Sequence, residues 1–216
     1  DVRKPGEEAI TVVTATINRP GLLAACESVQ AQTLAPVKHI ILLQQLMESP
    51  VPHIPKPSRV PLEIHWLPPP QPHIVEALSY VESLARPPWV AMLDDDCWWE
   101  KDHLEVLGNL MDETSADFVW SSSMIHGEDG REGVWMGLDG VVHSYKDEDR
   151  PIFGCIDTNE ILFRRENIEK WGGFRMEEHR GIDGRRIERW VKNGAVYAHS
   201  SVPTNHYTWR PVPAFA

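Results

Sequence analysis

Apolar positions along the first quarter of the chain follow two different periods. Residues 9–15 and 37–43 are largely β-branched or aliphatic, which is typical of strands buried on both faces of a parallel sheet. Between them, residues 22–32 place their apolar side chains on one face of a helix. A strand, a helix and a strand within about 35 residues form a βαβ unit, so the two strands are predicted to be parallel.

The rest of the pattern predicts a mixed α/β chain. Nine of the eighteen prolines fall between Pro50 and Pro72, which predicts loops around at most one short strand. Residues 128–142 hold four glycines among alternating apolar residues and are predicted to form a hairpin. The other predicted elements are helices over 74–84, 103–111, 165–171 and 183–193, and strands over 62–67, 89–93, 118–122 and 158–164. This order indicates an α/β sandwich with a mixed sheet, in which ligands bind beyond the carboxyl ends of the strands.

Length and charge narrow the class of protein. The chain has 216 residues, enough for one buried core, and it has neither a signal-peptide core nor the roughly 18-residue apolar run of a membrane span. A net charge of −11 argues against a surface that mainly binds nucleic acid or anionic membrane. The scattered Cys26, Cys97 and Cys155 fit a reducing compartment better than a disulfide scaffold or a zinc site. We therefore expect one cytoplasmic domain without stable membrane insertion.

Three consecutive aspartates follow the apolar run at residues 89–93. Asp94, Asp95 and Asp96 are therefore expected at the carboxyl end of a buried strand, with Asp94 and Asp96 on one side of an extended chain and Asp95 on the other. Crowded carboxylates repel one another unless a cation offsets their charge, and oxygen ligands suit Mg²⁺ or Mn²⁺. The alternatives are a solvated acidic loop or a cap for the helix that begins at His103.

Three segments, in order, resemble family 2 glycosyltransferases of the GT-A fold. Residues 93–104, Leu-Asp-Asp-Asp-Cys-Trp-Trp-Glu-Lys-Asp-His-Leu, resemble the DxD region of that family. Residues 12–20 and 28–33 are similar to its first strand and helix. Residues 157–165, continuing to Gly172-Gly173-Phe174, resemble its acceptor-side strand and helix. Together they span most of residues 9–210.

The resemblance implies a fold and a reaction. The fold is the GT-A (nucleotide-diphospho-sugar transferase) fold, a Rossmann-like three-layer sandwich with a mixed sheet. Residues 1–216 then form one domain, with a nucleotide-binding half at about 9–100 and an acceptor-binding half at about 101–210. The implied activity is that of a metal-dependent, inverting, hexosyltransferase-type enzyme. Its expected donor is a UDP-sugar, and its acceptor is the hydroxyl of a carbohydrate or another molecule.

The same analogy assigns roles to residues near the donor. Asp94 and Asp96 would hold Mn²⁺ or Mg²⁺ against the donor diphosphate, and Asp95 would contact the ribose or the sugar. The nucleotide would sit at the end of the first strand, on Thr14, Thr16 and Arg19. The alternative interpretation of Arg19 is a solvated cation at the start of a helix.

Two positions depart from the family pattern. The second strand ends in Gln44-Gln45, where the family commonly has a pair of aspartates that reads the base. The Gln44 amide can still hydrogen-bond a base edge, but the change weakens the expectation of uridine. Ile182 replaces a glutamate that usually precedes the catalytic aspartate.

An inverting transfer needs a general base, and the resemblance assigns it to Asp183. The alternative role of Asp183 is a cap or first-turn carboxylate that the helix dipole favours. Near the end of the chain, His206 is expected as a third metal ligand and Arg210 as a phosphate contact.

Two other classes of function stay open. The departures at Gln44 and Ile182 fit a non-catalytic nucleotide-sugar or carbohydrate-binding protein on the same scaffold. A glycosyltransferase that acts on a modified DNA base is the third class. The negative net charge argues against a DNA acceptor, while a group of five arginines close together in the sequence favours it. This basic strip consists of Arg164, Arg165, Arg185, Arg186 and Arg189.

Overall fold

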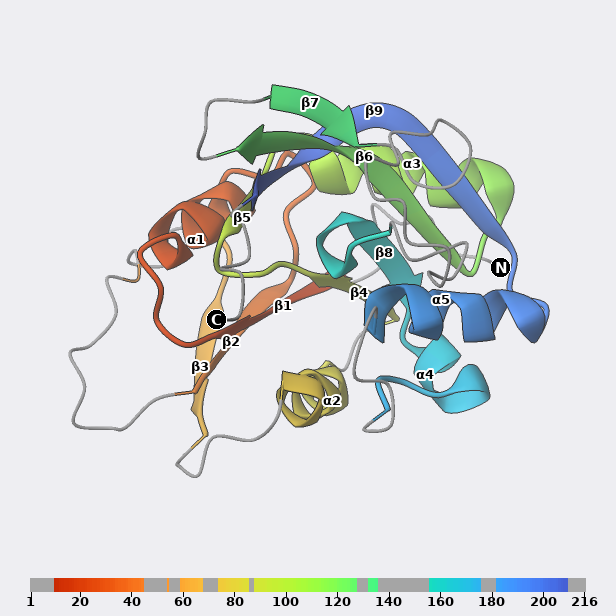
Figure 1. Cartoon of the computed structure of the whole chain (residues 1–216), viewed down its shortest axis with the longest axis horizontal. Helices are drawn as coiled ribbons and strands as arrows, with labels where there is room; N and C mark the ends of the chain where they lie inside the picture. The colour runs from red at the N-terminus through yellow and green to blue at the C-terminus, as the bar shows by residue number, and fades with distance from the viewer. Residues whose placement is uncertain are drawn as a thin grey trace, which may run out of the picture.

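The structure is a computed structural model that describes residues 10–44, 54, 59–67, 74–85, 88–127, 132–135, 156–175 and 182–209 (Figure 1). In chain order they form β1 (Ile10–Thr16), α1 (Leu22–Gln30), β2 (Lys38–Leu43), β3 (Leu62–Trp66), α2 (Ile74–Leu84), β4 (Trp89–Met92), β5 (Cys97–Trp99), α3 (His103–Thr114), β6 (Phe118–Gly127), β7 (Glu132–Trp135), the 3₁₀ turn η1 (Thr158–Glu160), β8 (Ile161–Arg164), α4 (Glu166–Trp171), α5 (Ile182–Lys192) and β9 (Tyr197–Trp209).

All the described strands join one mixed sheet. Its order is β3-β2-β1-β4-β8-β6-β9-β5, and β7 pairs with β6 outside this path. The strands β1, β2, β3 and β4 pair in parallel, as the predicted βαβ unit requires. Antiparallel pairing joins β8 to β4 and to β6, whereas β9 runs parallel to β6. The sheet curls, so that β5 at its far end returns toward β1 (Figure 1).

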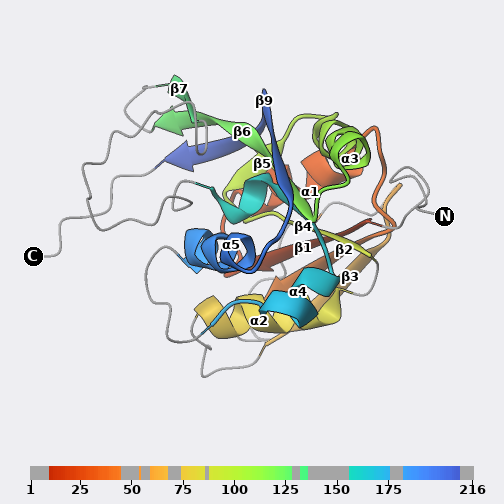
Figure 2. The same ribbon diagram turned by 90° about the vertical axis from the view of Figure 1, so that its right-hand side faces the viewer.

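Helices cover both faces of the sheet (Figure 2). One core lies against α1 and α3 and contains Val12 and Leu162, while a second lies against α2, α4 and α5 and contains Val13 and Phe163. Neighbours along a strand fall into different cores because side chains alternate across a sheet. This confirms the predicted three-layer sandwich. None of the described helices is long and apolar enough to span a membrane.

Some predicted elements need correction. The strand expected over 158–164 begins as the turn η1, because Asp157 and Glu160 form a reciprocal capping box there. The strands β5 and β9 were not predicted. β5 has only three residues, and β9 is rich in polar residues and pairs with β6 through an irregular register at Ser121–Ser123. Of the hairpin predicted over 128–142, the structure describes only β7, and this strand pairs antiparallel with β6, which precedes the predicted range.

Candidate functional site

A pocket opens where three parallel strands end. The chain leaves β1, β2 and β4 at the same edge of the sheet, and the pocket there has a volume of about 240 Å³. It is lined by Ala15, Thr16, Ile17, Arg19, Gln44, Asp94, Asp95, Asp96, Asp157 and Tyr207. Six of the residues predicted to bind donor or metal are therefore in one place: Thr16, Arg19, Gln44, Asp94, Asp95 and Asp96.

The middle aspartate ties the β4 end to the β1 end. The Thr16 hydroxyl donates to Asp95 Oδ2 at 2.5 Å, and the Arg19 guanidinium donates to Asp95 Oδ1 at 3.3 Å. Gly21 makes this approach possible, because a Cβ at that position would collide with the Asp95 carbonyl oxygen. Asp95 is 3% exposed, so its carboxylate mainly organises the floor of the pocket.

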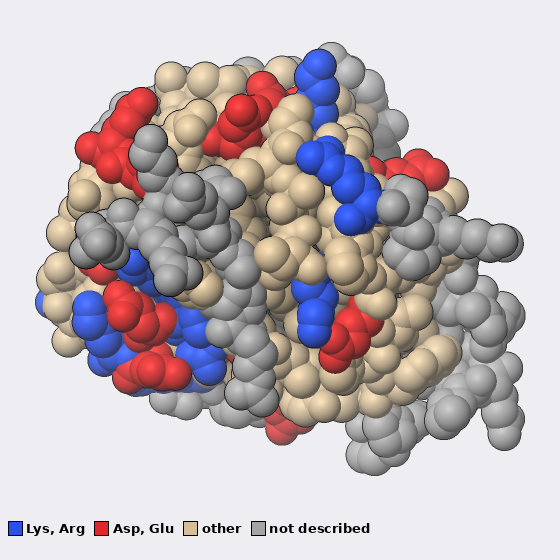
Figure 3. All heavy atoms as spheres, turned by 180° about the vertical axis from the view of Figure 1, so that it is seen from behind, with Lys and Arg blue, Asp and Glu red and all other residues tan. Residues whose placement is uncertain are grey.

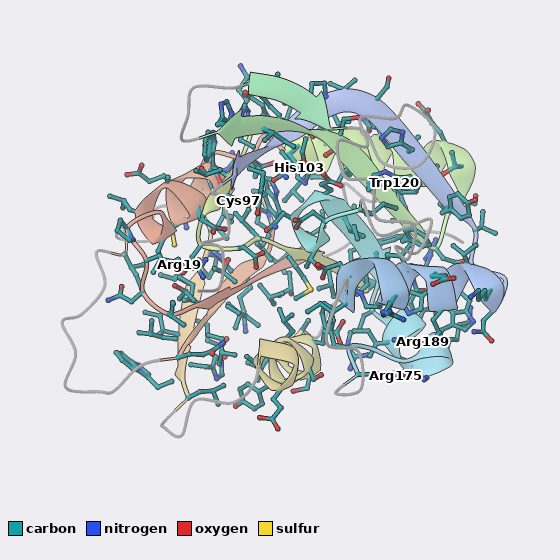
Figure 4. All side chains as sticks on the ribbon, in the orientation of Figure 1. Arg19, Cys97, His103, Trp120, Arg175 and Arg189 are labelled. Atoms are coloured by element: carbon teal, nitrogen blue, oxygen red, sulfur yellow. The ribbon has the colours of Figure 1, made fainter. Side chains whose placement is uncertain are left out.

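The three aspartates do not alternate as predicted. The chain turns at residues 95–96 and is not extended there, so the carboxylates of Asp95 and Asp96 both contact the Arg19 guanidinium. The Arg19 Nη1 lies 2.9 Å from Asp96 Oδ2. In Figure 4, Arg19 is labelled between β1 and α1, near Cys97 at the start of β5.

The first aspartate is held from the other side by η1. The backbone N–H of Asp94 donates to the Asn159 side-chain oxygen, and the Asn159 amide donates to Asp94 Oδ2 at 3.1 Å. The same amide also donates to Asp157 Oδ1. The capping box of η1 thus fixes Asn159, and Asn159 brings two carboxylates, Asp94 and Asp157, together.

Negative charge accumulates at this side of the pocket. Burial, followed by the charge of Asp157, raises the pKa of Asp94 well above its usual range. Burial and the charge of Asp183 raise the pKa of Asp157 to about 6. Each carboxylate makes ionisation of the next one harder, so a cation in the pocket would relieve this repulsion.

The described residues contain no preformed group of three or more His, Cys, Asp or Glu side chains that could hold a metal ion. The donor set nevertheless fits a hard divalent cation that arrives with a diphosphate. Mg²⁺ usually keeps several waters and binds one or two carboxylates together with substrate phosphates. Asp94 and Asp96 supply such carboxylates in the lining of the pocket.

The predicted base lies beside the pocket, in the first turn of α5. The Thr158 hydroxyl donates to Asp183 Oδ1. Burial raises the pKa of Asp183, although Thr158 and the charge of Arg186 act in the opposite direction. Since the charge of Asp183 also raises the pKa of Asp157 and Asp94, its carboxylate faces the same acidic cluster.

The sequence of the chain also matches a known protein family. A sequence profile described as "Glycosyl transferase family 2" matches residues 64–172, which is half of the chain. The chain belongs to glycosyl transferase family 2. No curated protein matches the chain.

Solved structures extend the comparison to the fold of this family 2 domain. It is similar to S. aureus TarS 1–349, with a TM-score of 0.69, 14% identity, and coverage of 93% of this chain and 60% of that chain. The complex of TarS 1–349 with UDP has a TM-score of 0.65 and 14% identity, and the match covers 94% of this chain and 61% of that chain. The complex with UDP-GlcNAc has a TM-score of 0.67 and 14% identity, with coverage of 96% and 62%. The predicted GT-A fold is confirmed. The chain spans about 60% of the length of those TarS chains.

Two residues of the family 2 domain that were predicted to bind donor or metal, Thr14 and His206, do not line the pocket. Thr14 is fully buried within β1, where its hydroxyl pairs with His39 Nε2 at 2.9 Å, so it is part of the core. His206 has both ring nitrogens engaged, Nε2 with Glu100 at 2.8 Å and Nδ1 with His126 at 2.9 Å, and we do not propose it as a metal ligand. Arg210 lies outside the described residues.

Sequence reasoning missed two polar residues that line the pocket, Asp157 and Tyr207. Asp157 opens the segment that resembles the acceptor-side strand, but only the turn η1 points it toward Asp94. Tyr207 follows His206, and because neighbours on a strand face opposite sides, it reaches the pocket while His206 does not. Burial, and then the charges of Asp157 and Asp96, raise the pKa of the Tyr207 phenol, so its hydroxyl remains a hydrogen-bond donor.

The predicted basic strip is not a continuous surface in the described residues. Arg186 is buried, Arg165 pairs with Glu169 at 3.3 Å, and Arg164 stacks on the Trp89 ring. Arg189 donates to backbone carbonyls beside Gly172, where Arg175 also lies (Figure 4). On the face drawn in Figure 3, acidic and basic side chains are interspersed. The strip therefore gives little support to a DNA-base acceptor.

Proposed function

We propose that this domain is a metal-dependent, inverting glycosyltransferase that moves a sugar from a nucleotide-diphosphate donor to an acceptor hydroxyl. The main support for this proposal is the pocket at the ends of β1, β2 and β4, which is lined by four aspartates, one arginine and one glutamine. Family membership supports glycosyl transfer, and the acidic cluster supports a role for a divalent cation.

The donor would occupy this pocket with its base at Gln44 and its diphosphate at the aspartates. Gln44 follows β2 directly and its backbone N–H donates to the Thr16 carbonyl, so its side-chain amide would offer a donor and an acceptor to a base edge. Thr16 and Asp95 would meet the ribose or the sugar, and Arg19 the diphosphate. A UDP-sugar is the expected donor, which the fold shared with the UDP and UDP-GlcNAc complexes of TarS supports.

Asp94 and Asp96 would hold Mn²⁺ or Mg²⁺, with Asp157 adding negative charge beside them. When bound, the cation would offset the charge on the departing nucleoside diphosphate. Tyr207 lines the same pocket, and its hydroxyl would donate a hydrogen bond to an oxygen of the nucleotide-sugar. Arg19 would move from Asp96 to the diphosphate once a cation is present.

Asp183 would act as the general base. The acceptor oxygen attacks the anomeric carbon on the face opposite the diphosphate, and Asp183 accepts the hydroxyl proton as the new bond forms. A carboxyl whose pKa is raised by burial is a stronger base than one in water, so its environment suits this step. The cytoplasm is the compartment we propose, since Cys26 and Cys97 are free, buried thiols.

The proposal is tested by release of nucleoside diphosphate from a panel of UDP-, GDP- and dTDP-sugars, with and without Mn²⁺. We expect Mn²⁺-dependent release from at least one UDP-sugar. Asp183→Asn keeps the size of the side chain but cannot take the proton, so the rate should fall about 10²–10⁴-fold with donor affinity retained. Glu188→Gln, on the same helix, is the matched control and should keep the wild-type rate. Binding without turnover of any donor would instead support the non-catalytic alternative.

A further inference from the structure

A fully buried ion pair lies behind the proposed active site. Arg186 of α5 is 0% exposed, and its Nη1 donates to Glu82 Oε1 of α2 at 2.7 Å, with the Glu82 side chain 3% exposed. Burying two charges costs solvation energy, and replacing such a pair by apolar side chains is often neutral or stabilising. Stability alone is therefore a weak reason for these residue types.

The surroundings of Arg186 leave the pair incompletely satisfied. Its guanidinium carbon lies over three aromatic rings, 4.2 Å from the centroid of Phe174, 5.0 Å from that of Trp190 and 5.1 Å from that of Phe163. Its Nε and Nη2 have no hydrogen-bond partner among the described residues. The three aromatic rings therefore fix the plane of the guanidinium by packing, at the expense of two buried donors.

Glu82 anchors this arrangement to the neighbouring elements. Its second oxygen accepts the backbone N–H of Phe174 at 3.2 Å. Gly173 permits that contact, because a Cβ there would collide with Glu82 Oε2. Arg186 Nη1 also lies 3.7 Å from the sulfur of Met92, the last residue of β4 before the aspartate turn. One side chain thus joins α5 to α2 and to β4, the strand that precedes Asp94.

Arg186 follows Asp183 by one helical turn, so the two side chains lie on the same side of α5. In the first turn of α5, Asp183 accepts a hydrogen bond from the Thr158 hydroxyl of η1. We propose that Arg186, anchored by Glu82, is a positioning residue that holds Asp183 in register with the carboxylate pocket. This inference rests on the proposed role of Asp183 as the base.

The test compares the double variant Glu82→Gln/Arg186→Met with wild type. It removes both charges and leaves no unpaired ion, and the amide oxygen introduced by Glu82→Gln can still accept the Phe174 N–H. With Mn²⁺ and the UDP-sugar that gives the fastest UDP release, we expect kcat to fall at least tenfold. The donor KM should stay within about twofold and the melting temperature within a few degrees. Arg186→Lys, which keeps the charge but loses the planar fork, should recover part of kcat.

Two results would overturn the positioning role. One is a wild-type kcat in the double variant, and the other is a parallel loss of kcat, donor affinity and melting temperature, which marks a merely structural pair. If the double variant does not fold, Arg186→Lys decides alone, and a wild-type kcat in it counts against the proposal. Asp183→Asn, measured in parallel, separates the two claims: wild-type transfer by that variant overturns both the base and its positioning residue.

Discussion

The pocket at the end of β4 and the junction between α2 and α5 both bury charge, but they balance it differently. In the pocket, the partly buried carboxylates of Asp94 and Asp157 lie near Asp183, while the Arg19 guanidinium faces Asp95 and Asp96. At the junction, one arginine meets one glutamate at 2.7 Å. An unbalanced cluster has charge left over for a ligand to neutralise, whereas the two charges of a balanced pair neutralise each other and leave none for a ligand.

Breaking the balanced pair should have the largest effect on stability. Arg186→Met leaves the buried charge of Glu82 without a cationic partner, which is expected to lower the free energy of unfolding by about 3–5 kcal/mol. Asp157→Asn is the matched change in the pocket, and it should cost little because it relieves repulsion and Asn can still cap η1. Urea unfolding of both variants measures the difference. Equal losses would show that the two regions are not electrostatically distinct.

The pocket should respond to pH in the range where its carboxylates titrate. The pKa of Asp157 is raised to about 6, so lowering the pH from 7 to 5 protonates it and removes negative charge from the pocket. Protons then compete with the cation, and Mn²⁺ affinity should fall about tenfold over this interval. The Mn²⁺ affinity at each pH can be measured from the electron paramagnetic resonance signal of free Mn²⁺. Asp157→Asn should bind Mn²⁺ more weakly at pH 7 and show a shallower pH dependence.

The smallest expected effect concerns the arginine that partly neutralises the pocket. Arg19 is 42% exposed, so its contact with Asp96 has at most a modest energy. In Arg19→Gln, Mn²⁺ alone should bind about two- to fivefold more tightly because a competing cation is gone. UDP affinity should fall in the same variant, since a phosphate partner is lost. Changes of the same sign for both ligands would contradict a competition between Arg19 and the cation.

The parallel half of the fold was predictable because its signals are local. The apolar runs of β1, β2 and β4 are continuous and lead directly into polar residues, and parallel strands bring those ends together. The identity of six pocket residues followed from this rule and from the family resemblance. The bounds of α2 were also predicted correctly.

The other half depends on contacts between distant segments. β9 is polar and has few local strand signals, and its pairing with β6 and β5 decides that Tyr207 faces the pocket while His206 faces Glu100. The role of Asp157 depends on a capping box and on the Asn159 amide, which no hydrophobic period indicates. The turn at Asp95–Asp96 likewise follows from contacts with Thr16 and Arg19, not from the aspartate run itself.

Titration calorimetry of UDP binding tests most directly whether the acidic pocket takes a cation together with the donor. The wild-type domain should bind UDP at least about tenfold more tightly in Mn²⁺ than in EDTA, since the metal bridges carboxylates and phosphates. Asp96→Ala should lose this difference, while the control Asp102→Ala, whose side chain makes no capping bond at α3 in the described structure, should keep it. Unchanged Mn²⁺-dependent UDP affinity in Asp96→Ala would contradict the account.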